Sequence, residues 1–280
     1  MLEMFTVDRI IKSALEEDLG WGDVTTDSTI PMDAAIKGNF IAKEQGIVCG
    51  IDVCKRVFEI MDSSITFEIL ITDGLMVQKG DIIAKISGPA RSILKGERVS
   101  LNLLQRMSGI ATAANKYAEA VQGTGARVVD TRKTMPGLRI LDKYSVLAGG
   151  CHNHRFNLSD LVLIKDNHIK AAGGITPAVK RAKEKLSHTL KIEVEVESLG
   201  QLKEALEAGA DIIMLDNMSL EMMRDAVELA SGKAILEASG NVALEGSRSV
   251  KAIAETGVDI ISVGALTHSV LAMDISLRFE

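Results

Sequence analysis

The sequence predicts an α/β protein whose second half forms a parallel β-sheet closed into a barrel. From about Ala126 onward, short apolar runs alternate with helical stretches, and nearly continuous apolar strands are typical of parallel sheets with both faces covered. Two near repeats, 209–213 and 257–261, each place a glycine helix stop before a buried strand. The predicted strands are Ala126–Asp130, Asp160–Lys165, Lys191–Glu195, Asp211–Asp216, Ala234–Glu237 and Asp259–Gly264.

The first part of the chain predicts a mixed α/β region. Apolar spacing indicates helices over Val7–Asp18 and Val53–Met61, with short strands at Lys37–Ala42 and Gly46–Cys49. Short apolar runs and glycine turns over 73–89 predict a small β-sandwich. That segment faintly resembles a lipoyl or biotinyl carrier module, but it has no Met-Lys-Met or Asp-Lys-Ala hairpin tip for the cofactor.

Three helix starts can be assigned in the second half. Thr176 precedes Pro177 as a cap residue, Ser198 opens a capping-box pattern with Gln201, and Ser219 can cap the following helix.

Composition excludes several classes of function. The 280 residues are 46% hydrophobic and 3% aromatic with a net charge of -6, which argues against a nucleic-acid partner. No apolar run reaches the roughly 20 residues of a membrane span, and the start of the chain shows no signal-peptide pattern. Three cysteines fit reduced thiols better than a disulfide framework. We therefore expect a cytoplasmic protein.

One segment reverses the acidic balance. Between Thr131 and Lys170, seven lysines and arginines stand against three aspartates, and three of the five histidines lie there too. Cations gathered among apolar segments repel one another and lose hydration unless an anion joins them. The segment therefore predicts a pocket for a small, strongly anionic substrate. The cations are Arg132, Lys133, Arg139, Lys143, Arg155, Lys165 and Lys170.

Polar residues also gather where the predicted strands end, the face that carries the active site in (β/α) barrels. The first ends are cationic and suit carboxylates or phosphates, whereas Glu195 and Asp216 suit Mg²⁺ or a sugar hydroxyl. The last ends offer small residues and backbone N–H groups that can hold a terminal phosphate. This order fits a phosphorylated sugar that meets a carboxylated partner. The ends are 130–133, 165–168, Glu195 with Glu197, 216–217, 237–241 and 264–268.

Several of these runs resemble the quinolinate phosphoribosyltransferase family, in order and over nearly the whole chain. They are EDLGWGDVT (17–25), LNLLQRMSGIAT (101–112), DTRKTMPGLR (130–139), GGCHNHR (149–155), LIKDNH (163–168), EVE (193–195), LDN (215–217) and EASG (237–240).

The resemblance implies a phosphoribosyltransferase type II-like architecture. An N-terminal α/β sandwich, residues 1–110 joined by 270–280, would stand beside an incomplete (β/α) barrel, residues 111–269. It implies a homodimer with shared active sites that converts quinolinate and phosphoribosyl pyrophosphate, with Mg²⁺, into nicotinate mononucleotide, pyrophosphate and CO₂, a step of NAD biosynthesis.

The resemblance also implies the roles of individual residues. Lys133, Glu195 and Asp216 would be catalytic, and the two carboxylates would hold the metal. Quinolinate would be bound by Arg132, His154, Arg155, Lys165 and, from the other subunit, Arg106. The 5′-phosphate would be surrounded by Ser239, Gly240, Asn241, Gly264, Ala265 and His268, with Asn241 where family members often have a second glycine.

Other interpretations of the same residues stay open. Lys165 at a strand end could form a Schiff base, and the run 151–154 could suggest a metal site, although its spacing fits no standard zinc pattern. Glu193 and Glu197 share the alternation of Glu195, so the spacing alone does not choose among them. The whole protein could be the molybdenum-transport paralogue, which acts on another aromatic acid, or a noncatalytic anion-binding protein.

Overall fold

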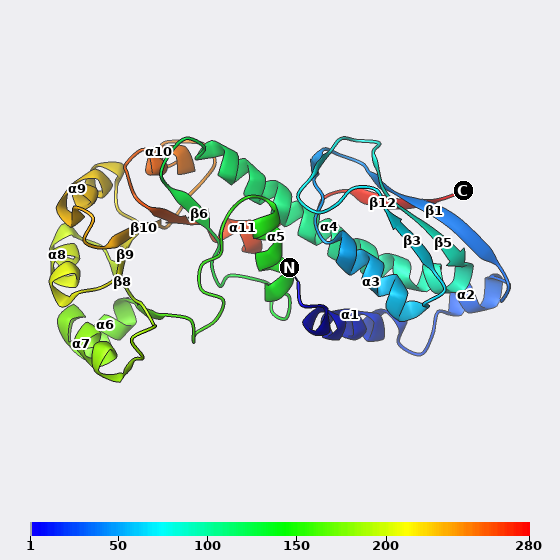
Figure 1. Cartoon of the computed structure of the whole chain (residues 1–280), viewed down its shortest axis with the longest axis horizontal. Helices are drawn as coiled ribbons and strands as arrows, with labels where there is room; N and C mark the ends of the chain where they lie inside the picture. Colours follow the sequence, from blue (N-terminus) through cyan, green and yellow to red (C-terminus); the bar gives the residue numbers. More distant parts are fainter. Residues whose placement is uncertain (1) are drawn as a thin grey trace. The chain divides into compact units, whose positions relative to one another are not determined.

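The computed structural model describes residues 2–280 and divides into two compact units (Figure 1). The first comprises Met1–Asn115, Thr134–Gly150 and Leu266–Glu280. The second comprises Lys116–Lys133 and Cys151–Ala265. The long helix α4 (Ala90–Ala120) begins in the first unit and ends in the second.

The first unit is an α/β sandwich, as the resemblance implied. Its antiparallel sheet has the order β12 (Ile275–Phe279), β1 (Ala35–Ala42), β5 (Ile82–Pro89) and β3 (Thr66–Ile69). The chain's last strand therefore pairs with β1, with Phe40 opposite Leu277. Buried side chains of this sheet pack against α3 (Ile51–Met61) and α4, with Phe40 and Phe58 in edge contact.

The predicted small β-sandwich over 73–89 is wrong. The strand β4 (Met76–Val77) pairs with β2 (Gly46–Ile47), whereas β5 lies in the middle of the larger sheet. The two strands find partners far away in the chain, which their own periodicity does not reveal.

The helix predicted near the N-terminus is α1 (Met4–Leu19), whose buried Val7, Ile11 and Leu15 recur at a spacing of four. This stripe packs against the side of α3 that carries Val53 and Val57. The remaining helices of the first unit are α2 (Val24–Thr29) and α5 (Arg139–Ala148), and α11 (Ala265–His268) begins at the boundary.

The second unit contains the predicted parallel sheet, in the order β6-β11-β10-β9-β8-β7. Within residues 2–280, β6 and β7 form its two edges and do not pair, so the incomplete barrel of the resemblance is confirmed and a closed barrel is wrong. Successive helices pack side by side outside it (Figure 1). The strands are β6 (Arg127–Val129), β7 (Val162–Ile164), β8 (Ile192–Val196), β9 (Ile212–Asp216), β10 (Ile235–Ser239) and β11 (Ile260–Ser262). The helices are α6 (Asp166–Ala172), α7 (Ile175–Lys185), α8 (Leu199–Ala208), α9 (Leu220–Ala230) and α10 (Val250–Ala254).

The two near repeats have a structural explanation. Asp211 accepts a hydrogen bond from the backbone N–H of Ile192, and Asp259 accepts one from Leu236, both at 2.8 Å. Asp211 thus satisfies the N–H of the first residue of β8, and Asp259 that of the second residue of β10, which fixes the register at the start of the sheet.

Two of the three predicted caps are confirmed: Ser198 accepts from Gln201 N–H and Ser219 from Met222 N–H. The cap at Thr176 is wrong, because α7 already begins at Ile175. Glu204 on α8 instead accepts both the N–H (3.0 Å) and the hydroxyl (2.9 Å) of Thr176. Within residues 2–280, none of the helices combines the length and the apolar character needed to cross a bilayer.

Candidate active site

A cavity of about 220 Å³ lies within the second unit, at the ends of the parallel strands. It brings together five side chains that the sequence placed in the anion pocket: Arg132, Lys133, His154, Arg155 and Lys165. Four cations around one small cavity favour an anionic occupant. The other lining residues are Thr131, Leu163, Met214, Glu237, Ser239 and Ser262.

Asp130, which is fully buried at the end of β6, positions two of these residues. Its carboxylate accepts a hydrogen bond from His154 N–H at 2.8 Å, and its own N–H donates to the carbonyl of His152 at 3.1 Å. A further bond from His152 N–H to Val128 holds the segment parallel to β6. The extended segment then directs His154 and Arg155 to the cavity.

The electrostatics of Arg155 indicate an anion site. Burial lowers the pKa of this guanidinium, and the nearby charge of Arg132 lowers it further, whereas Glu193 and Asp160 raise it. Two guanidinium groups held close together repel each other, and a bound carboxylate relieves that repulsion.

Lys165 and Glu195, which the sequence assigned to different substrates, contact each other. Lys165 Nζ lies 2.8 Å from Glu195 Oε2, with 47% of the lysine side chain and 13% of the glutamate side chain exposed. An ion-paired ammonium has no lone pair for a carbonyl, so this geometry disfavours the Schiff-base alternative. It also joins the cationic part of the site to its acidic part.

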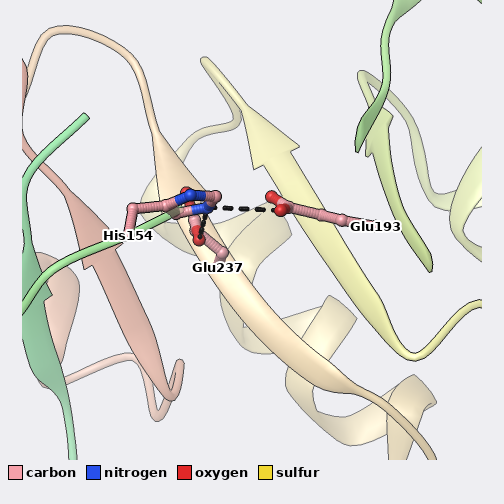
Figure 2. Close-up of side chains that lie close together, drawn as sticks. All are labelled: His154, Glu193 and Glu237. Carbon is pink, nitrogen blue, oxygen red and sulfur yellow. Dashed lines mark ion pairs between the residues drawn. The ribbon is translucent and has the colours of Figure 1, made fainter. Parts of the chain in front are cut away.

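His154 lies between two buried glutamates (Figure 2). Its Nε2 is 3.2 Å from Glu193 Oε2 and 3.2 Å from Glu237 Oε2, and both glutamates are 0% exposed. Its Nδ1 accepts a 2.7 Å hydrogen bond from Arg155 N–H. Both ring nitrogens are therefore engaged by the chain, while His154 also lines the cavity. Its predicted contact with quinolinate stays a prediction.

The protonation of this cluster has two opposing indications. Burial lowers the pKa of His154, but Glu193 and Glu237 raise it to about 10, which favours an imidazolium. An imidazolium, however, would direct its Nδ1 proton at the Arg155 N–H, a contact between two donors. The hydrogen bond from Arg155 N–H to Nδ1 requires a lone pair on that nitrogen, so we assign the neutral ring with its proton on Nε2. Burial raises the pKa of Glu193, because the charged form loses its hydration.

Glu193 and Glu237 are the residues that the sequence analysis missed. Glu193 stood beside Glu195 as an equal by alternation, and Glu237 was placed at a strand end without a role. The sequence did contain a signal for both. Each glutamate lies inside an apolar strand, two residues before a predicted site residue (Glu195 or Ser239), and residues i and i+2 of a strand share a face.

Of the metal alternative at 151–154, the geometry retains His154 and leaves out Cys151. Cys151 is buried, and burial raises the pKa of its thiol to about 12, so it stays protonated. In the described part of the chain, the one cluster of metal-ligand type is His154, Glu193 and Glu237, which does not include this thiol.

The Gly-rich end of β10 has a defined backbone. Gly240 has a φ of +92°, and an added Cβ would lie 2.1 Å from Asn217 Oδ1, so a side chain here would force Asn217 to move. Asn241 also has a left-handed φ of +50°, which asparagine tolerates, and its amide donates to Asn217 Oδ1 at 3.3 Å. The backbone therefore reaches the left-handed form without a second glycine.

Arg248 stabilises this turn and was not predicted. Its guanidinium donates to the carbonyls of Ser239 (3.1 Å), Gly240 (2.9 Å) and Met218. Because the carbonyls point toward Arg248, the turn is held in one conformation at the edge of the cavity.

The predicted metal ligands end adjacent strands. Glu195 is the fourth residue of β8, and Asp216 is the last residue of β9, which pairs in parallel with β8. Asp216 accepts a hydrogen bond from the Asn217 amide at 2.9 Å. Two carboxylates on neighbouring strands are a donor set that suits Mg²⁺, which usually takes one or two carboxylates together with substrate phosphates.

Eight predicted site residues are not among those that line the cavity: Glu195, Asp216, Gly240 and Asn241, described above, and Gly264, Ala265, Arg106 and His268. Gly264 and Ala265 follow β11 in the second unit. Arg106 and His268 belong to the first unit, where Arg106 donates to both oxygens of Asp142 at 2.9 and 2.8 Å, and His268 Nδ1 lies 2.8 Å from Ser269 Oγ. Their roles toward substrate stay predictions.

Comparisons with known proteins identify the family of the chain. Residues 110–278 match the family model for the C-terminal domain of quinolinate phosphoribosyl transferase, and residues 23–108 match its N-terminal domain. The chloroplastic nicotinate-nucleotide pyrophosphorylase [carboxylating] of Arabidopsis thaliana is 47% identical, over 99% of this chain and 83% of its own length. A probable enzyme of that name from Bacillus subtilis is 44% identical, over 93% of this chain and 89% of its own.

Solved structures give the same result. The nicotinate-nucleotide pyrophosphorylase of Francisella tularensis superposes with a TM-score of 0.94 at 41% identity, covering 100% of this chain and 98% of its own. Since two family models together span nearly the whole sequence and both relatives exceed 40% identity, the chain belongs to the quinolinate phosphoribosyltransferase family.

Proposed function

We propose that the protein transfers phosphoribose from phosphoribosyl pyrophosphate to quinolinate and releases pyrophosphate and CO₂, forming nicotinate mononucleotide for NAD biosynthesis. The observation that carries this proposal is the cavity itself, where Arg132, Arg155 and Lys165 face a space suited to a small dicarboxylate. The catalysed reaction needs such a site beside a phosphate-binding turn and a pair of carboxylates.

The chain contributes positioning and electrostatics to this reaction. Arg132, Arg155 and Lys165 hold the quinolinate carboxylates so that the ring nitrogen faces the ribose carbon. As the bond to pyrophosphate breaks, positive charge grows on the ribose, and Glu195 and Asp216 stabilise it. Lys133 neutralises the departing pyrophosphate, while the turn at 239–241 and the residues after β11 retain the 5′-phosphate.

Decarboxylation follows from the new bond to nitrogen. Once the ring nitrogen is cationic, it stabilises the electron pair left on the adjacent carbon when CO₂ departs. Mg²⁺, held by Glu195 and Asp216, would supply additional positive charge next to the pyrophosphate. Chelation with EDTA should then abolish turnover, and added Mg²⁺ should restore it.

The assembly and the location are also proposals. Exposed apolar side chains of the first unit, Phe5, Trp21, Val24 and Met32, favour a homodimer. Light scattering during size-exclusion chromatography should give twice the 30.1 kDa chain mass. A cytoplasmic location is supported by the three buried cysteines, which form no disulfide in the described residues, and the absence of a nucleic-acid partner by the net charge of -6.

The decisive experiment incubates the protein with quinolinate, phosphoribosyl pyrophosphate and Mg²⁺, then measures nicotinate mononucleotide by chromatography and CO₂ by carboxyl-labelled quinolinate. Equal amounts of both products confirm the proposal. Ribosylation of a different aromatic acid without CO₂ would favour the molybdenum-transport paralogue. Binding of both substrates without any product would indicate a noncatalytic anion-binding protein.

A further inference from the structure

Glu237 is out of place in an anion-binding cavity. Among the residues that line it, Glu237 is the single carboxylate, and it faces the same space as Arg132, Lys133, Arg155 and Lys165. Its side chain is buried, so water does not screen its charge. An ionised Glu237 would repel a substrate that carries two carboxylates, and this residue therefore requires an explanation.

Glu237 and Glu193 are two carboxylates with one hydrogen-bond donor between them, His154 Nε2–H. Glu237 Oε2 lies 3.2 Å from His154 Nε2, and Glu193 Oε2 lies at the same distance from the same nitrogen. A neutral imidazole with its proton on Nε2 can donate to one acceptor well, but not to two. The four carboxylate oxygens of Glu193 and Glu237 are buried, and no donor besides this N–H reaches them in the described part of the chain, so the triangle has room for one more proton.

A metal ion is a weaker explanation of the same triangle. A histidine that binds a metal through Nε2 carries its proton on Nδ1 and donates it to an acceptor. Here Nδ1 instead accepts the N–H of Arg155 at 2.7 Å. The geometry therefore favours a proton between the glutamates and His154.

The proposed reaction requires one proton in this cavity, and the present inference rests on that reaction. When the bond from ring carbon C2 to its carboxylate breaks, CO₂ departs and the electron pair stays on C2. The product carries hydrogen at that carbon, so a donor must lie where the carboxylate was bound. Both nitrogens of His154 are engaged within the chain, and the lysines and arginines of the lining are needed as cations to balance the charge of the substrate. The cavity-lining carboxyl group of Glu237 is therefore the candidate donor.

We propose that Glu237 is the acid that protonates C2 after CO₂ departs. Its O–H bond breaks as the C2–H bond forms, which leaves the Glu237 carboxylate. His154 Nε2–H, 3.2 Å away, stabilises that carboxylate until water returns the proton in the next cycle. His154 is then a positioning residue for Glu237.

A single-turnover experiment with Glu237→Gln tests this role, because glutamine keeps the shape but cannot donate a carboxyl proton. Enzyme in excess is mixed with carboxyl-labelled quinolinate, phosphoribosyl pyrophosphate and Mg²⁺, and pyrophosphate, CO₂ and nucleotides are measured over time. We expect pyrophosphate release at the wild-type rate and nicotinate mononucleotide formation slowed roughly 100-fold or more. Because an unprotonated C2 recaptures CO₂, quinolinate mononucleotide should accumulate and should incorporate added ¹³CO₂.

Glu255→Gln is the matched control, since Glu255 is exposed at the end of α10, outside the cavity lining, and should behave like wild type. If Glu237→Gln forms both products at wild-type rates, or if both slow in parallel, the proposal is wrong. If Glu237→Gln does not fold, Glu237→Asp replaces it. Aspartate keeps a carboxyl group but holds it farther from C2, so nicotinate mononucleotide formation should again slow while pyrophosphate release does not. Wild-type enzyme that makes no product would instead contradict the proposed function, which separates the two failures.

Discussion

Two buried clusters of charge differ in how completely the chain satisfies them. In the first unit, the Arg106 guanidinium donates to both oxygens of Asp142, and Met135 N–H donates to the same carboxylate. In the second unit, Glu193 and Glu237 share a single imidazole N–H. A carboxylate that is fully satisfied within the chain holds the fold, whereas one that lacks a donor is prepared for a proton or a substrate.

The largest effect should come from breaking the satisfied pair. Arg106→Ala leaves Asp142 buried at 0% exposure with its main donor removed, which typically costs about 3–5 kcal/mol of unfolding free energy. Urea unfolding followed by circular dichroism measures this as a lower midpoint. Arg106→Lys should lose a smaller part of the unfolding free energy, because an ammonium keeps the charge but cannot form the bidentate contact. Unchanged stability with lost activity would instead support the predicted role of Arg106 as a substrate ligand.

Removing a cation from the cavity should have the opposite result: activity should fall while the free energy of unfolding stays unchanged. Arg155→Ala should unfold at the wild-type midpoint but lose about 2–4 kcal/mol of transition-state stabilisation, a 30- to 1000-fold lower kcat/KM. Lys133→Ala should behave in the same way. The matched control is Arg224→Ala, an exposed arginine on α9. Normal turnover in Arg155→Ala would remove this residue from the site.

The contrast also explains what the sequence could predict. Apolar runs indicated each strand of the parallel sheet within a few residues, because burial on both faces leaves a pattern that is local in the chain. The gathering of Arg132, Arg155 and Lys165 was also predictable, since the carboxyl ends of parallel strands meet at one edge. Pairings such as β2 with β4 were not, because periodicity does not identify a partner 30 residues away.

The same limit applies within the site. Glu193, Glu195 and Glu197 alternate equally, but burial separates them: Glu193 is enclosed beside His154, Glu195 contacts Lys165, and Glu197 lies exposed beyond β8. Arg248 acts through three backbone carbonyls that become neighbours only after folding. Such contacts depend on tertiary structure, and neither residue type nor spacing encodes them.

A smaller effect should follow from Gly240→Ala, which perturbs the turn without removing a charge. The strained φ together with the Asn217 clash should cost about 1–3 kcal/mol. We expect the KM for phosphoribosyl pyrophosphate to rise more than kcat falls. Gly232→Ala is the control, because Gly232 has a φ of +73° and no atom near its absent Cβ. If both variants bind substrate equally well, the turn at Gly240 does not shape the phosphate site.

The smallest effect should come from Glu204, a satisfied carboxylate at the surface of the second unit. The backbone N–H of Thr176, and then its hydroxyl, lower the pKa of Glu204, because both stabilise the charged form. A carboxyl whose folded pKa lies below its unfolded value of about 4.3 contributes stability above that value, and loses it as the pH falls through the folded pKa. Glu204→Gln should therefore lower the unfolding free energy at pH 7 by about 0.5 kcal/mol, since the contact is partly exposed.

At pH 3 the difference between wild type and Glu204→Gln should nearly vanish, because protonation weakens the wild-type contact as well. Thermal midpoints at both pH values measure this, with Glu207→Gln on the exposed side of the same helix as the control. A difference that stays constant with pH would mean that packing, and not the charge on Glu204, stabilises the start of α7. Glu204 would then differ from Asp142, where the ion pair itself holds the structure.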